Sequence, residues 1–373
     1  MILFVLIFLG LFGGINFYAF FQARSVFHFS GFHQIIIMIV LILLICAPIL
    51  VRVAEAYHQE FLARAIAYTG YIWMAFIFLF FFFNVTFEII AFLYKLTGSG
   101  AGSLPFRNIA FGAAIFLSFG FVIYGFIDAK QVRVKTLKVK TEKILPNDGK
   151  IRIVQISDVH VGLIVRDNRL QTILDRVKEA KPDILISTGD LMDGELDNVM
   201  SQAQQFVSIT PKYGKYAILG NHEYYAGLKR SLEFTKAAGF DLLRDDVRHI
   251  AGLSIFGADD ITGERMGVSK DKRLFEKMLA HQDNGFVLLL KHQPFVVDGE
   301  NFDLQLSGHT HGGQIFPFML ITRLFFPKNY GYFELGKNKS LYVSRGAGTW
   351  GPPVRVFAPP EITVIDLIGN KVN

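Results

Sequence analysis

Two histidines stand one residue apart in the stretch LSGHTHGGQ, residues 306–314, directly after a short apolar run. The glycines around His309 and His311 leave the backbone free to aim both imidazoles at a common point. Imidazole is the commonest side-chain ligand of metal ions in proteins, so this turn is a candidate metal site. A polar surface loop would look the same, because short motifs also occur by chance. The remaining sequence has to decide between the two interpretations.

Metal-type ligands also follow four other apolar, β-rich runs in the second half of the chain. These runs and the residues that follow them are IRIVQIS (151–157) before Asp158 and His160, DILISTG (183–189) before Asp190 and Asp193, KYAILG (215–220) before Asn221 and His222, and FVLLLK (286–291) before His292. Taken singly, each Asp or Asn could be a turn residue or a helix cap, and His292 could be a hydrogen-bonding loop residue. Their recurrence favours a shared site.

The first two runs are joined by a predicted helix over residues 168–180. Asp167 or Asn168 is its expected N-cap, Pro182 follows its end, and its apolar face consists of Leu170, Ile173, Leu174 and Val177. A strand–helix–strand unit predicts parallel strands with a right-handed crossover. Loops at the carboxyl ends of such strands gather in one crevice. That crevice is expected to hold Asp158, His160, Asp190, Asn221, His292, His309 and His311.

The first third of the chain differs sharply in composition. Residues 1–128 contain only five basic and four acidic side chains. They include four apolar runs, each near the ~20 residues that a membrane-spanning helix needs, at 1–22, 35–51, 71–94 and 109–127. Residues 52–68 are predicted to form an interfacial amphipathic helix. We therefore expect a transmembrane region of about four helices over 1–128 and a connecting, edge-strand segment over 129–149 that alternates with the period of a strand.

Charge limits the partners and suggests an orientation. A net charge of +6 without a dense basic patch gives no support to nucleic-acid binding. Four crossings would put both termini on one side, where eight basic residues flank the apolar runs, against three on the other. By the positive-inside rule the soluble part is expected in the cytoplasm, with the bilayer of a bacterial inner membrane as its partner. The lysines of VRVKTLKVKTEKI (132–144) could instead be the exposed face of an edge strand.

The motifs DVH, GDLMD, GNHE, KHQP and GHTHGG, in this order, resemble the calcineurin-like metallophosphoesterase superfamily over about residues 150–367. The segment from Ser344 to Leu367 is also similar to membrane-associated bacterial phosphoesterases. The resemblance implies a four-layer α/β/β/α sandwich, with residues 150–373 as the catalytic domain. It implies two divalent ions from Mn, Fe, Zn or Co. Their ligands would be Asp158, His160 and His311 for one ion, Asn221, His292 and His309 for the other, and Asp190 for both.

This geometry implies a phosphoesterase that hydrolyses a phosphodiester, phosphomonoester or pyrophosphate by attack of a metal-bridged hydroxide. His222 would protonate the leaving group, and Asp193 would orient the His222 ring. Arg345 and Arg355 could contact a substrate phosphate. The substrate is expected to be lipid-linked.

Two other functions compete with catalysis: a non-catalytic sensor of metal or phospho-ligand at the membrane, and a transporter with a regulatory soluble part. The pairing of His222 with Asp193 argues against the sensor, because pure binding needs no proton donor.

For three further carboxylates the sequence allows two interpretations each. Glu88, inside the third apolar run, is either functional or interfacial. Asp259 and Asp260 are either capping residues of a loop, the favoured interpretation, or outer carboxylates of the metal site.

Overall fold

The computed structural model of the chain describes residues 2–97, 104–193, 199–268, 274–280, 285–297, 299–336 and 338–371. Contacts divide the chain into two compact units. The helical unit contains Met1–Ile127 and Gly351–Val356, and the sheet unit contains Asp128–Trp350 and Phe357–Asn373. The segment Gly351–Val356 thus packs with the helical unit, although the sequence had grouped it with residues 150–373.

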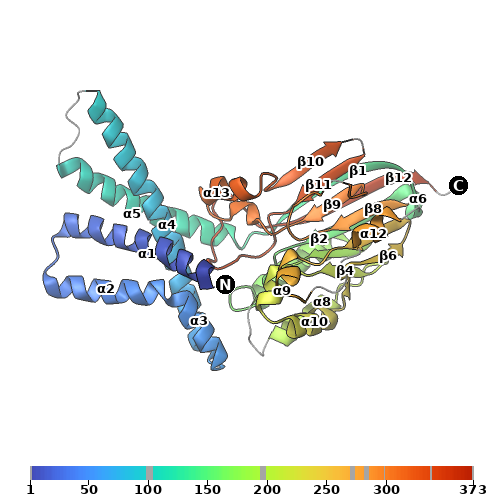
Figure 1. The fold of residues 1–373 in the computed structure, drawn as a ribbon, viewed down its shortest axis with the longest axis horizontal. Coiled ribbons are helices and arrows are strands. Elements are labelled where there is room, and N and C mark those ends of the chain that lie inside the picture. The colour runs from blue at the N-terminus through green and yellow to red at the C-terminus, as the bar shows by residue number, and fades with distance from the viewer. Residues whose placement is uncertain are drawn as a thin grey trace. The chain divides into compact units, whose positions relative to one another are not determined.

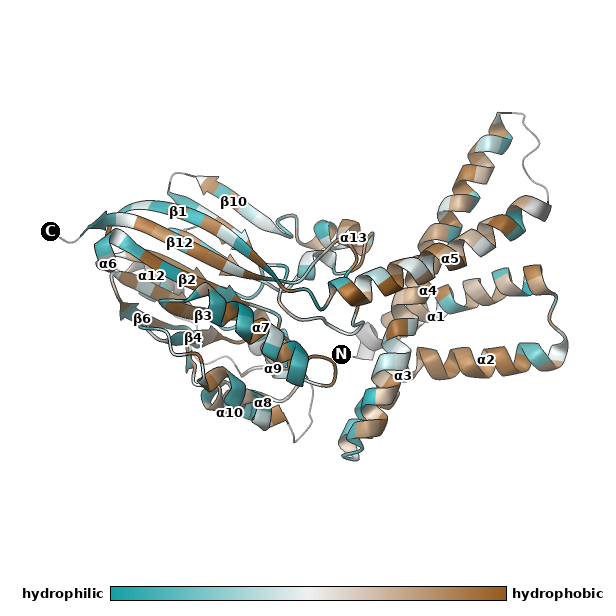
Figure 2. Ribbon diagram, turned by 180° about the vertical axis from the view of Figure 1, so that it is seen from behind, coloured by the Kyte–Doolittle hydropathy of each residue, from teal (hydrophilic) through white to brown (hydrophobic). Residues whose placement is uncertain are grey.

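Within its described residues, the helical unit is formed by apolar helices, drawn mostly in brown in Figure 2. Three of them, α1, α4 and α5, are long and apolar enough to cross a membrane, and α2 with α3 would make a fourth crossing if that bent pair is one span. The helices are α1 (Ile2–Phe27), α2 (Gly31–Ile45), α3 (Ala47–Ala56), α4 (Glu60–Leu96) and α5 (Leu104–Asp128). The described residues therefore contain three to four candidate spans, where the sequence predicted about four.

Two predicted helices differ from the structure in their boundaries. The run 35–51 is not one straight helix, because α2 and α3 meet at Cys46 with a bend of 57°. Pro48 explains the break, since its ring lacks the N–H that a continuous helix would use and clashes with the preceding turn. The amphipathic helix predicted over 52–68 is also divided, between the end of α3 and the start of α4. His58, with a φ of 55°, lies in the left-handed region that ends helices.

Glu88, whose role the sequence left open, joins two helices of this unit. Its Oε1 accepts a hydrogen bond from Gln22 Nε2 of α1 at 2.5 Å and another from Asn84 Nδ2 of its own helix α4 at 3.2 Å. Asn84 also donates to the hydroxyl of Tyr18 at 2.6 Å. Hydrogen bonds of this kind hold apolar helices together in a bilayer, where few other polar partners exist.

The sheet unit is built on two mixed sheets, which Figure 1 shows as the arrows of the second part of the chain. The described residues give each sheet six strands, in the orders β1-β12-β2-β3-β4-β5 and β10-β11-β9-β8-β7-β6. The bounds of the first are β1 (Arg133–Leu145), β2 (Lys150–Ile156), β3 (Ile184–Thr188), β4 (Lys215–Ile218), β5 (Asp241–Leu242) and β12 (Glu361–Lys371). Those of the second are β6 (Asp246–Ile250), β7 (Leu253–Gly257), β8 (Phe286–Leu290), β9 (Leu304–Ser307), β10 (Gly331–Gly336) and β11 (Lys339–Val343).

The two sheets pack face to face through one hydrophobic core. Ile153 and Ile186 of the first sheet belong to the same buried cluster as Leu288 and Leu304 of the second. On the other face of the second sheet, Val287 and Leu289 pack against α12 (Leu274–Leu279). Strands buried on both faces read as continuous apolar runs, which is why FVLLLK showed no alternation.

The five strands predicted to precede ligands are present as β2, β3, β4, β8 and β9. The first two are parallel and are joined by α7 (Asp167–Ala180), whose apolar face is buried as predicted. The N-cap of α7 is Arg166 rather than Asp167 or Asn168, because Asp167 already belongs to the first turn. Further helices of this unit are α8 (Met200–Val207), α10 (Leu228–Ala237) and α11 (Ile261–Arg265), with the single turn α6 (Pro146–Gly149) before β2.

Residues 133–145 form β1, at the edge of the first sheet, as the alternation of the segment predicted. Lys135, Lys138 and Lys140 are exposed along it. Charged side chains on an edge strand prevent it from pairing with other chains. These lysines therefore have a role in the fold, which weakens their use as markers of membrane orientation.

Candidate metal centre

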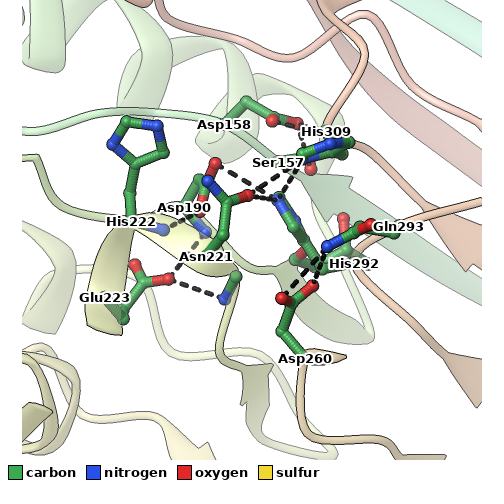
Figure 3. Close-up of polar contacts among 12 residues, drawn as sticks. Ser157, Asp158, Asp190, Asn221, His222, Glu223, Asp260, His292, Gln293 and His309 are labelled. Atoms are coloured by element: carbon green, nitrogen blue, oxygen red, sulfur yellow. Dashed lines mark hydrogen bonds and ion pairs between the residues drawn. The ribbon is translucent and has the colours of Figure 1, made fainter. Parts of the chain in front are cut away.

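The predicted ligands come from both sheets and meet at the carboxyl ends of five strands. Asp158 and His160 follow β2, and Asp190 follows β3. After β4, Asn221 begins the short helix α9 (Asn221–Tyr225). The second sheet supplies His292 after β8, His309 after β9, and His311 at the start of the turn η2 (His311–Gly313). Figure 3 shows five of these side chains converging: Asp158, Asp190, Asn221, His292 and His309.

One group of possible metal ligands consists of Asp158, His160 and His311, all buried. The Nε2 atoms of His160 and His311 lie 3.1 Å apart, and His311 Nε2 lies 3.5 Å from Asp158 Oδ1. Ligand atoms from the three residues lie within 4.8 Å of one another. Two imidazoles and a carboxylate that converge in this way match the ligands of transition metals.

The second group consists of Asp190, His292 and His309, with Asn221 beside them. Asn221 Oδ1 lies 3.1 Å from His292 Nε2 and 2.9 Å from His309 Nδ1. The other ring nitrogen of His292, Nδ1, is 2.8 Å from the carbonyl oxygen of Thr188. That carbonyl can only accept, so it fixes the proton on Nδ1 and leaves the Nε2 lone pair directed into the site.

Asp190 lies between the two groups. Its Oδ2 is 3.2 Å from His292 Nε2 in the second group and 3.8 Å from His160 Nε2 in the first. Its Oδ1 accepts the backbone N–H of His222 at 2.9 Å, which orients the carboxylate. A carboxylate oxygen near both groups is an arrangement that allows one residue to bind two ions.

The backbone is left-handed at most of these positions. Asp158, Asp190 and His311 have φ values of 50° to 51°, and His160 and His309 have values of 53° and 71°. Residues other than glycine adopt this conformation at a cost of about 1–3 kcal/mol each, and it persists where the surroundings enforce it, as at functional sites. The surrounding structure therefore holds these loops in a conformation that directs their side chains into the site.

Two glycines allow these loops to approach one another. A Cβ atom at Gly220 would collide with the Asp190 carboxylate, and one at Gly308 would collide with Ser157 and with Asp158. Any larger residue at either position would push apart loops that come from different strands. The glycines in GNHE and GHTHGG are thus explained by packing against ligands.

His222 and Asp193 form a pair beside the first group, and with His160 they make a third set of possible ligand atoms within 4.8 Å of one another. His222 Nδ1 lies 3.0 Å from Asp193 Oδ1. Burial acts to lower the pKa of His222, but the carboxylates of Asp190 and Asp193 raise it to about 9. The imidazole is therefore protonated at neutral pH, as a proton donor must be. The rings of Trp350 and Tyr225 stand edge-on to it, with centroids 5.8 Å and 5.6 Å away.

Two of the other histidines, His160 and His309, are shifted in the opposite direction. Burial, followed by the charge of neighbouring histidines, lowers the pKa of His160 to about 4 and that of His309 to about 3. Both are neutral at pH 7 and keep the lone pairs that bind a metal. Burial acts to lower the pKa of His292 as well, but the carboxylate of Asp190 raises it well above its usual value. The site thus sets His160 and His309 apart from His292 and His222.

Glu223 is a site residue that the sequence analysis missed. Its carboxylate accepts backbone N–H groups from Asp190, Leu191 and Gly220 at 2.9, 2.6 and 2.7 Å, so it ties the loop after β3 to the loop after β4. Burial and the nearby Asp190 raise its pKa to about 7. A glutamate at the third position of a helix that begins after Gly220 is a capping-box pattern, which could have identified it.

The remaining candidates fall into different places. Arg345 lies beside Gly312, and its guanidinium stacks on the ring of Tyr330 with 3.6 Å between the guanidinium carbon and the ring centroid. Arg355 is fully buried in the helical unit, where its backbone N–H donates to the carbonyl of Gly125 at 2.9 Å.

Asp260 caps α11, as the sequence favoured, and its carboxylate also accepts a hydrogen bond from the Gln293 side chain at 2.9 Å (Figure 3). Asp259 forms an ion pair with Arg244 at 2.6 Å.

Comparison with known proteins agrees with this geometry. Residues 151–313 match the family described as calcineurin-like phosphoesterase. An uncharacterized metallophosphoesterase of Aquifex aeolicus is 40% identical over 231 residues, covering 61% of this chain and 88% of the relative. The chain therefore belongs to the calcineurin-like metallophosphoesterases, and its class is that of metal-dependent phosphoesterase hydrolases.

Two further relatives are longer than the matched region. The uncharacterized metallophosphoesterase Cj0846 of Campylobacter jejuni is 37% identical over 61% of this chain and 62% of its own length. A protein of Danio rerio named transmembrane protein with metallophosphoesterase domain is 30% identical over 61% of this chain and 55% of its own length. The match thus spans 62% and 55% of the length of these two relatives.

Proposed function

We propose that the protein is a membrane-anchored phosphoesterase with two metal ions, which hydrolyses a phosphodiester, phosphomonoester or pyrophosphate carried on a lipid. In this proposal residues 1–128 are the transmembrane region, 129–149 connect, and 150–373 form the catalytic domain. The observation that carries the proposal is the position of Asp190 Oδ2, which lies 3.2 Å from one histidine and 3.8 Å from another in two separate ligand groups.

The side chains fit metal ions. His160 Nε2 faces His311 Nε2, and His292 Nε2 faces His309 Nδ1 at 3.3 Å. A proton shared between the two nitrogens of a pair would satisfy their hydrogen bonding only in part, because carboxylate and amide oxygens approach the same nitrogens. A metal ion at each pair would accept all of these atoms as ligands. Asp158, His160 and His311 would hold one ion, Asn221, His292 and His309 the other, and Asp190 both. Two such ions would supply an acidified water and neutralise charge on the phosphoryl oxygens.

The residues of the chain itself divide the remaining work. His222, protonated at neutral pH, would donate its Nε2 proton to the oxygen that leaves phosphorus. Asp193 holds Nδ1 of the same ring and so fixes the orientation of Nε2. Arg345, beside the GHTHGG turn, would bind a phosphate oxygen, and Arg355 stays a second candidate for that contact. This proton donor has no use in a non-catalytic sensor, so the pair favours catalysis.

The test is a metal analysis of the full-length protein, followed by hydrolysis assays on a panel of phosphoesters. We expect two divalent ions of the Mn, Fe, Zn or Co group per chain, and turnover of bis(p-nitrophenyl) phosphate that chelation abolishes. Phospholipid substrates in vesicles should be hydrolysed as well. A protein that carries both ions and hydrolyses nothing in the panel would favour the sensor.

We further propose that the catalytic domain faces the cytoplasm of a bacterial cell. With the lysines of β1 assigned to an edge strand, the support comes from Arg52, Arg64, Lys130 and Arg133 on that side of the spans.

The orientation predicts which cysteines can be labelled in intact cells. The sequence predicts a loop over 95–108, where the structure ends α4 at Leu96 and begins α5 at Leu104. In a Cys46→Ser background, a cysteine at Thr97 in this loop should react with an impermeant maleimide, and one at Lys138 should not. Residues 98–103 of this loop lie outside the described residues. Both positions should react after lysis, which controls for accessibility. Labelling at Lys138 in intact cells would place the active site on the outer face.

A further inference from the structure

The helix α13 (Phe318–Phe325) exposes its apolar side chains although it belongs to the sheet unit. Its sequence FMLITRLF contains a single charge, Arg323, and none of its residues is buried. The exposed fractions are 80% for Leu324 and 69% for Phe325. We define the α13 face by its five large exposed apolar residues, which are Phe318, Leu320, Ile321, Leu324 and Phe325.

These residues form one continuous stripe. At 100° per residue the five positions fall within an arc of roughly 160°, with Thr322, Met319 and Arg323 on the rest of the helix. Met319 faces the domain, because it lies directly against Gly313 of the η2 turn. The stripe therefore points away from the domain core. Exposed apolar patches of this kind mark sites of interaction.

The helix is tied to the metal centre at several points. The ring of Phe326, the residue after α13, stands edge-on to the ring of His309 with 5.0 Å between centroids. Phe326 also packs on Phe295 at 5.2 Å, and the hydroxyl of Thr310 donates to the carbonyl of Asn329 at 2.5 Å. A surface that binds α13 would therefore also restrict the turn that carries the candidate metal ligands His309 and His311.

We propose that the α13 face inserts into the headgroup region of a phospholipid bilayer. The apolar stripe fits the acyl boundary, and Arg323 on its flank fits anionic headgroups. The chain connection keeps the sheet unit close to the membrane that α5 is proposed to span, since only four residues separate the end of α5 at Asp128 from the start of β1 at Arg133. Four residues reach at most about 14 Å. The bilayer is therefore the apolar surface that this domain meets continuously.

This second membrane contact has a consequence for the site. The turn that carries His309 and His311 would lie at the level of the lipid headgroups, where phosphoesters are concentrated. The contact rests on the transmembrane region of the proposed function but does not require turnover, so the quenching experiment and the hydrolysis assays can fail separately.

The experiment measures depth in the bilayer. Full-length protein with Cys46→Ser receives Leu324→Cys, is labelled with the fluorophore NBD, and is reconstituted into vesicles of phosphatidylcholine and phosphatidylglycerol. Doxyl-labelled phosphatidylcholine then quenches probes that touch lipid. The control is Val207→Cys, at the end of α8, where the natural side chain is 45% exposed in the same unit. A probe at Arg323→Cys reports the polar side of α13 itself.

We expect the probe at position 324 to be blue-shifted and quenched several-fold more than the probe at 207, with position 323 intermediate. Equal quenching at 324 and 207 would overturn the proposal. A blue shift at 324 without quenching by the lipid would overturn it too, because the face would then be covered by protein, either another part of this chain or a second copy.

Discussion

Replacing Asp190 by alanine should remove metal from both positions of the centre. Asp190 Oδ2 lies near both groups, at 3.2 Å from His292 Nε2 and 3.8 Å from His160 Nε2. The loss of one shared ligand weakens the binding of both ions, and the loss of its charge removes part of the compensation for two cations at a buried site. We expect the affinity to fall on the order of tenfold or more at each position. Metal content per chain, measured by mass spectrometry on the purified full-length protein, checks this.

Three companion variants make the result specific. Asp190→Asn keeps the shape of the side chain and should lose metal as well, which separates charge from misfolding. His311→Ala should empty mainly the position shared with Asp158 and His160. Asp175→Ala, at an exposed site on α7, should keep both ions. Two tightly held ions per chain in the Asp190→Ala protein would show that the ligand assignment is wrong.

Replacing His222 by alanine should leave both ions bound and slow hydrolysis by about 10²–10⁴-fold, the usual range for a positioned proton donor. The imidazole lies outside the two ligand groups, 3.0 Å from Asp193, so its loss should not change the metal content. The loss should shrink for p-nitrophenyl esters, because nitrophenolate leaves without a proton. Rates on a matched pair of alkyl and nitrophenyl diesters measure the difference. An equal loss on both substrates would remove His222 from this role.

Asp193→Asn tests the same pair by its pH dependence. The carboxylates of Asp190 and Asp193 hold the pKa of His222 at about 9, so the acid form is present below that pH and is lost as the pH rises through it. Removing the Asp193 charge should lower this pKa. The alkaline fall in the rate on an alkyl diester should then begin at a lower pH, with the metal content unchanged. A purely structural role of Asp193 would reduce the rate at every pH and leave the alkaline limb in place.

The sequence alone determined the strands, the types of the candidate ligands and the class of chemistry. Apolar runs such as FVLLLK are local signals, because a strand buried on both faces needs nothing but apolar residues. The candidate ligands follow these strands directly, so Asp158, Asp190 and His309 could be found without knowing which strands are neighbours. Helix α7 was predictable for the same reason, since the spacing of apolar residues within its own 14 residues defines its buried face.

Only the tertiary structure decided how the loops meet. The face-to-face packing of two sheets brings His292 and His309 to Asp190, and no local pattern encodes a contact between strands so far apart in sequence. The left-handed backbone at Asp158 and His311 is likewise imposed by the surrounding loops, because residues other than glycine do not choose it by themselves. The exposure of Leu324 depends on what the fold leaves uncovered. An apolar run such as FMLITRLF reads as core in any sequence, and only its position on the folded domain shows that it faces outward.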